Sequence, residues 1–256
     1  MDAAWSAGEE PVVGVIDGQA DATDAIEISD RLESVADVTI VSDEVDAVLE
    51  AEPSVLVAIG EAPLAALARA AVDIPVLPVG QVSGIESVDH GCVPDTLEAI
   101  IGGDAVSRPQ PVLGVSLEST DTVVSDRALF DVTLVTDEPA RISEYAVHSR
   151  GQSVATFRAD GVVAATPAGS HGYASTVDAP QVSAAIDAIA VAPIGPFVTQ
   201  TRQWVLPDDD LAFTVERNEN DVCLVVDDRS IGTVTMDARV TVSVTDTLST
   251  LVVPEA

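Results

Sequence analysis

The chain has 256 residues, 47% of them hydrophobic, which is enough to fold around one large core or two smaller ones. It carries 43 acidic and 11 basic residues, a formal net charge of −32, and every basic residue is an arginine. The absence of lysine excludes a phosphate-loop lysine, a Schiff base and a protein-kinase strand lysine, and the acidic balance disfavours nucleic-acid binding.

The acidic residues are spread along the chain, which favours adaptation to a salt-rich cytoplasm over an acidic surface that binds a partner. At molar salt the Debye length is about 3 Å, so self-repulsion is tolerable. The acidic start has no signal-peptide pattern, and no uncharged apolar run is long enough to span a membrane. We expect a cytoplasmic homo-oligomer with no membrane or nucleic-acid partner.

The first hundred residues alternate short apolar runs with helical patterns. The runs predict strands at 11–16, 37–41, 54–60 and 74–80, and the helical spacing predicts helices at 21–35, 42–52, 63–72 and 94–103. Strands that are apolar throughout indicate a parallel sheet covered on both faces, which binds ligands beyond the carboxyl ends of its strands. Gly60, Glu61 and Ala62 follow one such strand.

After "GGDAVSRPQP" the segments become short and rich in valine and threonine, with turn residues between them. They predict strands at 112–117, 131–136, 153–159, 211–218, 222–228, 232–236 and 239–244, with one helix within 169–187. The predicted fold class is therefore α/β plus β: a parallel-sheet domain at 1–105 and an antiparallel β domain at 106–256. Whether the last strand returns to the first domain stays open.

Residues 160–173 read "DGVVAATPAGSHGY", an Asp-Gly pair, an apolar strand and a small-residue loop that ends on a tyrosine. With "DAIAVAPIGP" at 187–196, "VLPDD" at 205–209 and "VVDD" at 225–228, in that order, the chain resembles the NAD kinase family over most of its length. The resemblance implies ATP-dependent phosphorylation of the 2′-hydroxyl of the adenosine ribose of NAD, with Mg²⁺, to give NADP.

The resemblance also implies which residues form the site, and here the chain departs from the family. The catalytic Asp of the family's GGDG motif corresponds to Glu61 in "AIGEAPL"; Gly60 is kept, Ile59 and Ala62 replace glycines, and Pro63 replaces a threonine. Phe130 and Asp131 replace the Asn-Glu pair that binds ribose and adenine. The implied nucleotide-binding residues are Gly60, Asp131, Asp160, Gly161, Thr166, Gly169, Ser170, His171 and Tyr173, with Asp160 at the nicotinamide end and Tyr173 as the stacking ring.

These changes differ in their physical consequences. Glu61 keeps a carboxylate, displaced by about one methylene, and near-attack geometry fails over about 1 Å. A β-carbon at positions 59 and 62 obstructs the approach of phosphate to the backbone, and Pro63 removes one N–H donor. Phe130 cannot hydrogen-bond a ribose, although it can stack on a base.

Structural alternatives stand beside these roles. Asp160-Gly161 can be an ordinary turn, Glu61 a solvated acid at a helix start, and His171 a helix cap. We interpret His90 and His148 as surface or packing residues, Asp208 to Asp210 as a solvated loop, and Cys92 and Cys223 as buried free thiols, with no metal site.

The sequence thus favours a family member that binds NAD or NADP with weak or absent kinase activity. The alternatives are a working NAD kinase that uses Glu61 and Asp131 with ATP and Mg²⁺, or a regulatory or structural partner of an intact kinase. A lipid kinase sharing the GGDG element fits the 160–173 loop less well.

Overall fold

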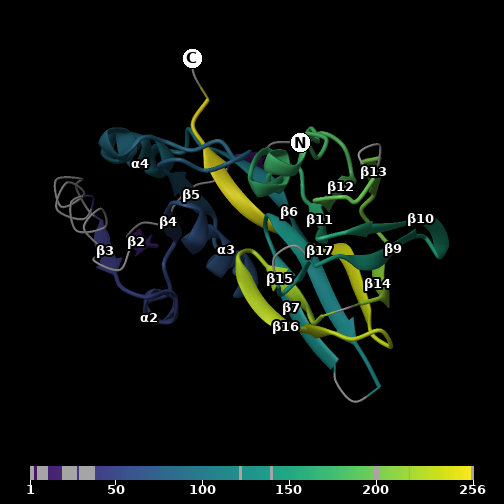
Figure 1. Cartoon of the computed structure of the whole chain (residues 1–256). Helices are drawn as coiled ribbons and strands as arrows, with labels where there is room; N and C mark the ends of the chain where they lie inside the picture. Colours follow the sequence, from purple (N-terminus) through teal and green to yellow (C-terminus); the bar gives the residue numbers. More distant parts are fainter. Residues whose placement is uncertain are drawn as a thin grey trace. The chain divides into compact units, whose positions relative to one another are not determined.

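The computed structural model describes residues 3–4, 11–18, 28, 38–120, 123–138, 141–198, 202–218 and 220–254 (Figure 1). The chain divides into two compact units, one formed by residues 1–110 with 247–256 and the other by residues 111–246. Each unit is described by itself.

The first unit is built on a parallel sheet with the strand order β5-β4-β2-β3. Its strands are β2 (Val12–Asp17), β3 (Thr39–Ser42), β4 (Val55–Ile59) and β5 (Val76–Val79). All five positions of β4 are buried, as expected for a central strand that is apolar throughout. Thr250, near the end of β17 (Arg239–Val252), lies parallel beside Val76 of β5. At the other end of the chain, β1 (Ala3–Ala4) pairs antiparallel with the start of β6 (Val106–Glu118).

Helices follow these strands: α2 (Val45–Glu50), α3 (Glu61–Arg69) and α4 (Val93–Gly102), the last preceded by the 3₁₀ helix η1 (His90–Cys92). Helix α3 buries one apolar face, and α4 ends at Gly103 in the left-handed conformation. The helix expected at 21–35 lies outside the described residues except for Ile28, which is helical and 2% exposed. The other predicted strands and helices of this unit are confirmed, with ends shifted by a few residues.

The second unit contains a six-stranded antiparallel sheet in the order β13-β12-β11-β8-β15-β16. Its strands are β8 (Asp131–Thr136), β11 (Gly161–Ala165), β12 (Ala188–Ile194), β13 (Trp204–Pro207), β15 (Val222–Val226) and β16 (Arg229–Val234). Antiparallel pairing also joins β9 (Ser143–Ser149), β10 (Gln152–Ala159), β14 (Leu211–Arg217) and the first part of β17, and joins β7 (Val123–Ala128) to β6. Inward side chains of both strand groups form one core around Tyr145 and Phe213, both fully buried. The α/β-plus-β fold class is confirmed.

The helix expected within 169–187 is instead two 3₁₀ helices, η2 (Gly169–His171) and η3 (Tyr173–Val177). Hydroxyl groups here donate to nearby carbonyl oxygens: Ser175 to Gly172 at 2.7 Å and Thr176 to Tyr173 at 2.7 Å. Such local hydrogen bonds compete with a regular helix, as does the glycine at position 172. The predicted cap is also wrong, because η2 and η3 have no side-chain cap hydrogen bond, and His171 is exposed.

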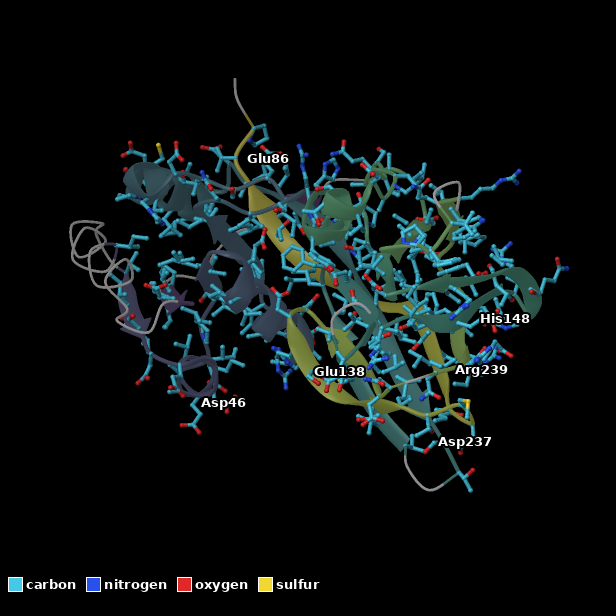
Figure 2. The ribbon with its side chains drawn as sticks, viewed as in Figure 1. Asp46, Glu86, Glu138, His148, Asp237 and Arg239 are labelled. Carbon is cyan, nitrogen blue, oxygen red and sulfur yellow. The ribbon has the colours of Figure 1, made fainter. Side chains whose placement is uncertain are left out.

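The structure also shows how far the cysteine and acidic side chains are exposed. The interpretation of the cysteines as buried thiols is wrong: Cys92 is exposed just before α4, and Cys223 is half-buried with its Sγ 3.7 Å from Asp137 Oδ1. Acidic side chains stand exposed on separate elements, as the labelled Asp46, Glu86, Glu138 and Asp237 show (Figure 2). Across the described ranges, no helix has the length and apolar character needed to cross a membrane.

Candidate functional site

The turn between β4 and α3 carries the first group of predicted site residues. Gly60 has φ 85° and ψ −176°, a conformation that favours glycine, and its N–H donates to the carbonyl of Val79 at 2.9 Å. Helix α3 begins at the next residue, Glu61. The turn therefore holds Gly60 between the ends of two neighbouring parallel strands.

A pocket of about 270 Å³ opens at this turn. It is lined by Gly18, Ile59, Gly60, Glu61, Ala62, Pro63, Gly80, Gln81 and His90, which follow or end the parallel strands β2, β4 and β5. Ligands of open parallel sheets bind at this edge, so the pocket lies where the sequence predicts one.

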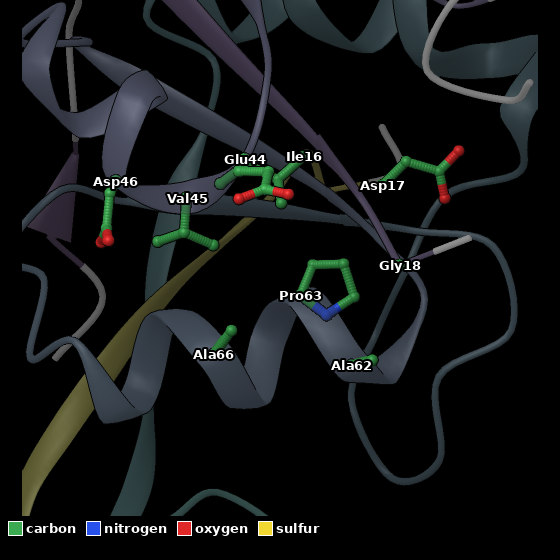
Figure 3. A pocket seen from close by; sticks show the side chains of 9 residues that line it. All are labelled: Ile16, Asp17, Gly18, Glu44, Val45, Asp46, Ala62, Pro63 and Ala66. Carbon is green, nitrogen blue, oxygen red and sulfur yellow. The ribbon is translucent and has the colours of Figure 1, made fainter. Parts of the chain in front are cut away.

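A second pocket of about 340 Å³ adjoins the first and shares Gly18, Ala62 and Pro63 with it. Figure 3 shows Asp17 and Asp46 at opposite ends of this pocket, with Glu44 and Pro63 between them. The described residues that line it include three carboxylates and no basic side chain. Because like charges repel, this wall is unfavourable for phosphate groups.

The residues that replace glycine and threonine in the turn between β4 and α3 change its packing as well as removing a backbone N–H donor. A β-carbon on Gly18 would lie 2.9 Å from Cδ of Pro63 and 3.3 Å from the methyl group of Ala62. The end of β2 therefore packs closely on the first turn of α3, where Pro63 offers no N–H. Ile59 lines the pocket, but it is only 5% exposed and belongs to the core of the first unit.

Glu61 is exposed in the first turn of α3, and its Oε1 accepts the N–H of Ser83 at 2.7 Å. A carboxylate at a helix N-terminus is stabilised by the helix dipole. The same carboxylate lines the first pocket. The geometry therefore accommodates both a helix-start acid and a base that faces a ligand.

In the second unit, Asp160 forms the bend between β10 and β11, and Gly161 is the first residue of β11. The Asp160 N–H donates to Ile194 at 2.9 Å, and its carbonyl accepts from Thr136 N–H at 2.9 Å and from the Tyr145 hydroxyl at 3.2 Å. A β-carbon on Gly161 would lie 2.4 Å from the carbonyl oxygen of Leu134. The strand-to-strand approach therefore requires glycine there.

The loop after β11 is fastened to the segment before β8 by buried hydroxyl groups. Thr166 Oγ1 donates to the carbonyl of Leu129 at 2.7 Å and accepts the N–H of Gly169 at 3.1 Å. Ser170 Oγ donates to Pro167 at 2.7 Å and accepts from Val182 N–H at 2.9 Å. Thr166 and Ser170 are fully buried, and their hydroxyl groups hold the loop in place.

Tyr173 is exposed and Asp131 is half-buried in this second group. Tyr173 is 46% exposed, and its pKa is raised by burial and by the charges of Asp131 and Asp228. Asp131 pairs with Ala165 at the start of the loop, and its Oδ1 accepts the hydroxyl of Thr133 at 3.2 Å. A half-exposed aromatic ring beside two carboxylates suits a flat ligand with hydroxyl or amino donors.

The neighbouring Phe130 is 8% exposed, so little of its ring is left to stack on a base. Its N–H and that of Leu129 donate to the carboxylate of Asp227 at 2.8 and 2.7 Å, and the N–H of Asp131 donates to the same carboxylate at 3.1 Å. The Asp227 carboxylate thereby holds the backbone of residues 129–131 in place.

The structure thus brings Gly60 and Glu61 together in the first unit, and Asp131, Thr166, Gly169, Ser170 and Tyr173 together in the second. Sequence reasoning missed two residues. His90 lines the pocket of Gly60, a role that its position after the fourth predicted strand could have indicated, and Asp227 stands in the noted "VVDD" turn. Among the described residues, no group of three or more His, Cys, Asp or Glu side chains could hold a metal ion.

Sequence comparisons show which known proteins this chain is similar to. Residues 129–253 match the family described as the ATP-NAD kinase C-terminal domain. The NAD kinase of Magnetococcus marinus is 31% identical over 158 residues, 60% of this chain and 52% of that protein. The NAD kinase of Methanosarcina mazei is 32% identical over 103 residues, 40% of this chain and 36% of that protein. The matched segments span about half or less of these relatives.

Solved structures show the same fold. Yeast NADH kinase complexed with NADH has a TM-score of 0.78 and 18% identity, covering 95% of this chain and 84% of that one. An NAD kinase from Archaeoglobus fulgidus in complex with ATP has a TM-score of 0.69 and 20% identity, covering 95% and 93%. The fold is that of kinases that act on pyridine dinucleotides. The matching C-terminal domain shows that residues 129–253 belong to the NAD kinase family, and the chain as a whole is similar to NAD kinases in sequence and in fold.

Proposed function

We propose that this chain binds a pyridine nucleotide, NAD or NADP, and has weak or absent NAD kinase activity. The observation that carries the proposal is the intact loop after β11. Its hydroxyl groups and glycines hold it against Phe130, and it ends on the exposed ring of Tyr173. Of the binding residues that the family resemblance implies, Thr166, Gly169, Ser170 and Tyr173 are kept there, whereas the residues of the catalytic turn other than Gly60 are replaced.

The kinase reaction makes demands that the first unit meets poorly. The 2′-oxygen of the ribose forms a bond to the γ-phosphorus of ATP, the bond to the β,γ-bridging oxygen breaks, and a base accepts the hydroxyl proton. Glu61 is the one carboxylate among the described residues lining the turn pocket. The Pro63 substitution and the three carboxylates of the adjoining pocket oppose the binding of triphosphate. In the described part of the chain, no group of three or more His, Cys, Asp or Glu side chains could hold a metal ion, so we assign no catalytic step to Mg²⁺.

A working NAD kinase is the second candidate, and the position of Glu61 favours it. Its carboxylate lines the pocket at the carboxyl ends of β4 and β5, where a base would be needed. Its hydrogen bond from Ser83 orients it. Loss of a positioned base typically lowers the rate by about 10²–10⁴, so the two candidates differ by a measurable factor.

The experiment is nucleotide binding and NADP formation measured on the same purified protein in molar KCl. We expect NAD or NADP to bind in a calorimeter, and NADP formation from NAD, ATP and Mg²⁺ to be far below ordinary enzyme rates. Turnover at about 1 s⁻¹ or faster would establish the kinase. Absence of binding by either nucleotide would overturn the proposal. We further propose a cytoplasmic, salt-adapted homo-oligomer, on the grounds of the acidic surface and the family.

A further inference from the structure

The pocket beside Gly60 and Glu61 has a third polar side chain, contributed by a distant part of the sequence. His90 lies at the start of η1, and a β-carbon on Gly80 would be 3.3 Å from its Nε2. Gly80 has φ 81°, so this position favours glycine both by its backbone and by the closeness of the ring. The imidazole therefore stands beside the carboxyl end of β5.

Backbone hydrogen bonds fix the segment that carries His90. Gly80 and Val88 are joined by the donation of the Gly80 N–H to the Val88 carbonyl at 2.8 Å, and the Ser87 hydroxyl donates to the Gly80 carbonyl at 2.7 Å. Immediately after His90, the Cys92 N–H donates to Asp89 at 2.9 Å. The ring is therefore placed at the pocket by an ordered turn.

His90 differs in its possible charge from the other residues that line the pocket. Of the nine residues that line it, His90 is the only one whose side chain can become positive, and Glu61 is the only acid. Asp17 lines the neighbouring pocket, and the ionisable residues near His90 in the sequence are Glu86, Asp89, Cys92 and Asp95. Glu86 pairs with Arg108 at 3.1 Å. The Oε1 of Glu61 is engaged by the Ser83 N–H.

The pocket has room for part of a dinucleotide. Its volume of about 270 Å³ lies just under the roughly 300–1,000 Å³ of pockets that hold a drug-sized ligand. Three of its lining residues, Gly18, Gly60 and Gly80, have no side chain to block access. Since Pro63 has removed a backbone donor and the chain has no lysine, an anionic group entering here needs a donor from another side chain.

We propose that His90 binds a phosphate group of the nucleotide in this pocket, donating a hydrogen bond from its protonated imidazole. The inference rests on the proposed function, because the phosphate belongs to the bound dinucleotide. It adds a phosphate contact that the family resemblance does not assign. The contact needs the protonated imidazole, so binding through it weakens as the pH rises.

The chain has three histidines, which makes the contact visible by proton NMR. The imidazole signals of His90, His148 and His171 can be assigned with single His→Gln variants. In molar KCl, we expect NAD to shift the His90 signal and to move its titration midpoint to higher pH. Adenosine and nicotinamide, which have no phosphate, should leave that midpoint in place. An unchanged His90 signal under saturating NAD would overturn the inference.

Calorimetry supplies the second measurement. We expect His90→Gln to weaken NAD binding about tenfold at pH 6, as for the loss of one charge-assisted hydrogen bond, and to remove the pH dependence. His90→Arg should keep the affinity and lose the pH dependence. His148→Gln, on β9, is the matched control and should bind as the wild type does. NAD binding that is unaffected by His90→Gln refutes the His90 contact alone, whereas absence of NAD binding by the wild type refutes the proposed function with it.

Discussion

The backbone of Gly169 lies so close to the carbonyl of Phe130 that a β-carbon on Gly169 would come within 2.0 Å of that oxygen. The contact joins the loop after β11 to the residue before β8. It is flanked by the hydrogen bond from Thr166 N–H to the same carbonyl at 2.9 Å. Position 169 therefore accepts no side chain unless one of the two segments moves.

Gly169→Ala should lower the free energy of unfolding by about 1–3 kcal/mol, the usual cost of forcing extra atoms into a packed site. Chemical denaturation in molar KCl measures it. Gly102→Ala is the control, because outside the helix backbone the nearest atom to its β-carbon position is Asp104 Oδ2 at 4.0 Å. Equal stability of the two variants would contradict the close approach.

Tyr173→Ala should weaken or abolish binding of NAD or NADP, because the ring is the exposed aromatic surface of the loop. Base–aromatic stacking is worth about 1–3 kcal/mol, which corresponds to roughly a 5- to 150-fold loss of affinity. Tyr173→Phe keeps the ring and serves as the control. If calorimetry finds the affinity of Tyr173→Ala unchanged, the loop does not contact the nucleotide.

The effect of the Asp228 charge should be measurable as a change in the pKa of Tyr173. Burial raises the pKa of Tyr173, and the charges of Asp131 and Asp228 raise it further. Asp228→Asn should therefore lower the pKa of Tyr173, as read from tyrosinate absorbance. Asp178→Asn, another exposed aspartate in the left-handed conformation, should leave it in place.

The same raised pKa has a consequence for stability. A phenol whose pKa is raised in the folded state stabilises the protein fully below the unfolded value of about 10. The contribution is lost as the pH rises through the folded pKa. Stability measured upward from pH 9 should begin to fall near pH 10. Burial also raises the pKa of Tyr145, so both tyrosines contribute.

Low salt should destabilise the fold. At about 0.1 M salt the Debye length is about 10 Å, so repulsion among 43 acidic residues with only 11 arginines is no longer screened. Exposed pairs such as Arg150 with Asp209, at 2.8 Å, offset little of it. A loss of 3 kcal/mol would lower the melting temperature by roughly 6–12 °C. A melting temperature that holds steady during dialysis from molar KCl would refute the salt adaptation.

Restoring the catalytic residues should raise NADP formation. Glu61→Asp alone should not do so, because the carboxylate is the least altered element of the turn. Combining it with Ala62→Gly, Pro63→Thr, Phe130→Asn and Asp131→Glu should increase the rate. Ile59 is best left unchanged, because it is 5% exposed in the core. Phe130→Asn removes a buried ring, a change that costs about 3–5 kcal/mol when the replacement is alanine, so folding of the combined variant must be verified first.

The sequence predicts the strands and helices well where one residue pattern, such as a continuous apolar run, extends over the whole element. The apolar run that became β4 and the glycine that follows it located the turn, since a central strand and a left-handed glycine leave a local signature. His90 left no such signature, because its place in the pocket depends on how the chain folds back after β5. The 3₁₀ helices at 169–177 were missed because hydrogen bonds from Ser175 and Thr176 to nearby carbonyls outweigh helical propensity.

The carboxylate of Asp227 affects how the 129–131 segment responds to the anions in solution. The three successive backbone N–H groups of Leu129 to Asp131 donate hydrogen bonds to it. Successive N–H groups that form a concave surface commonly bind anions. In a chloride-rich solution such a concavity would be filled by whichever ion the solvent supplied. Here the chain supplies its own carboxylate, so the 129–131 segment needs no dissolved anion to satisfy its three N–H groups.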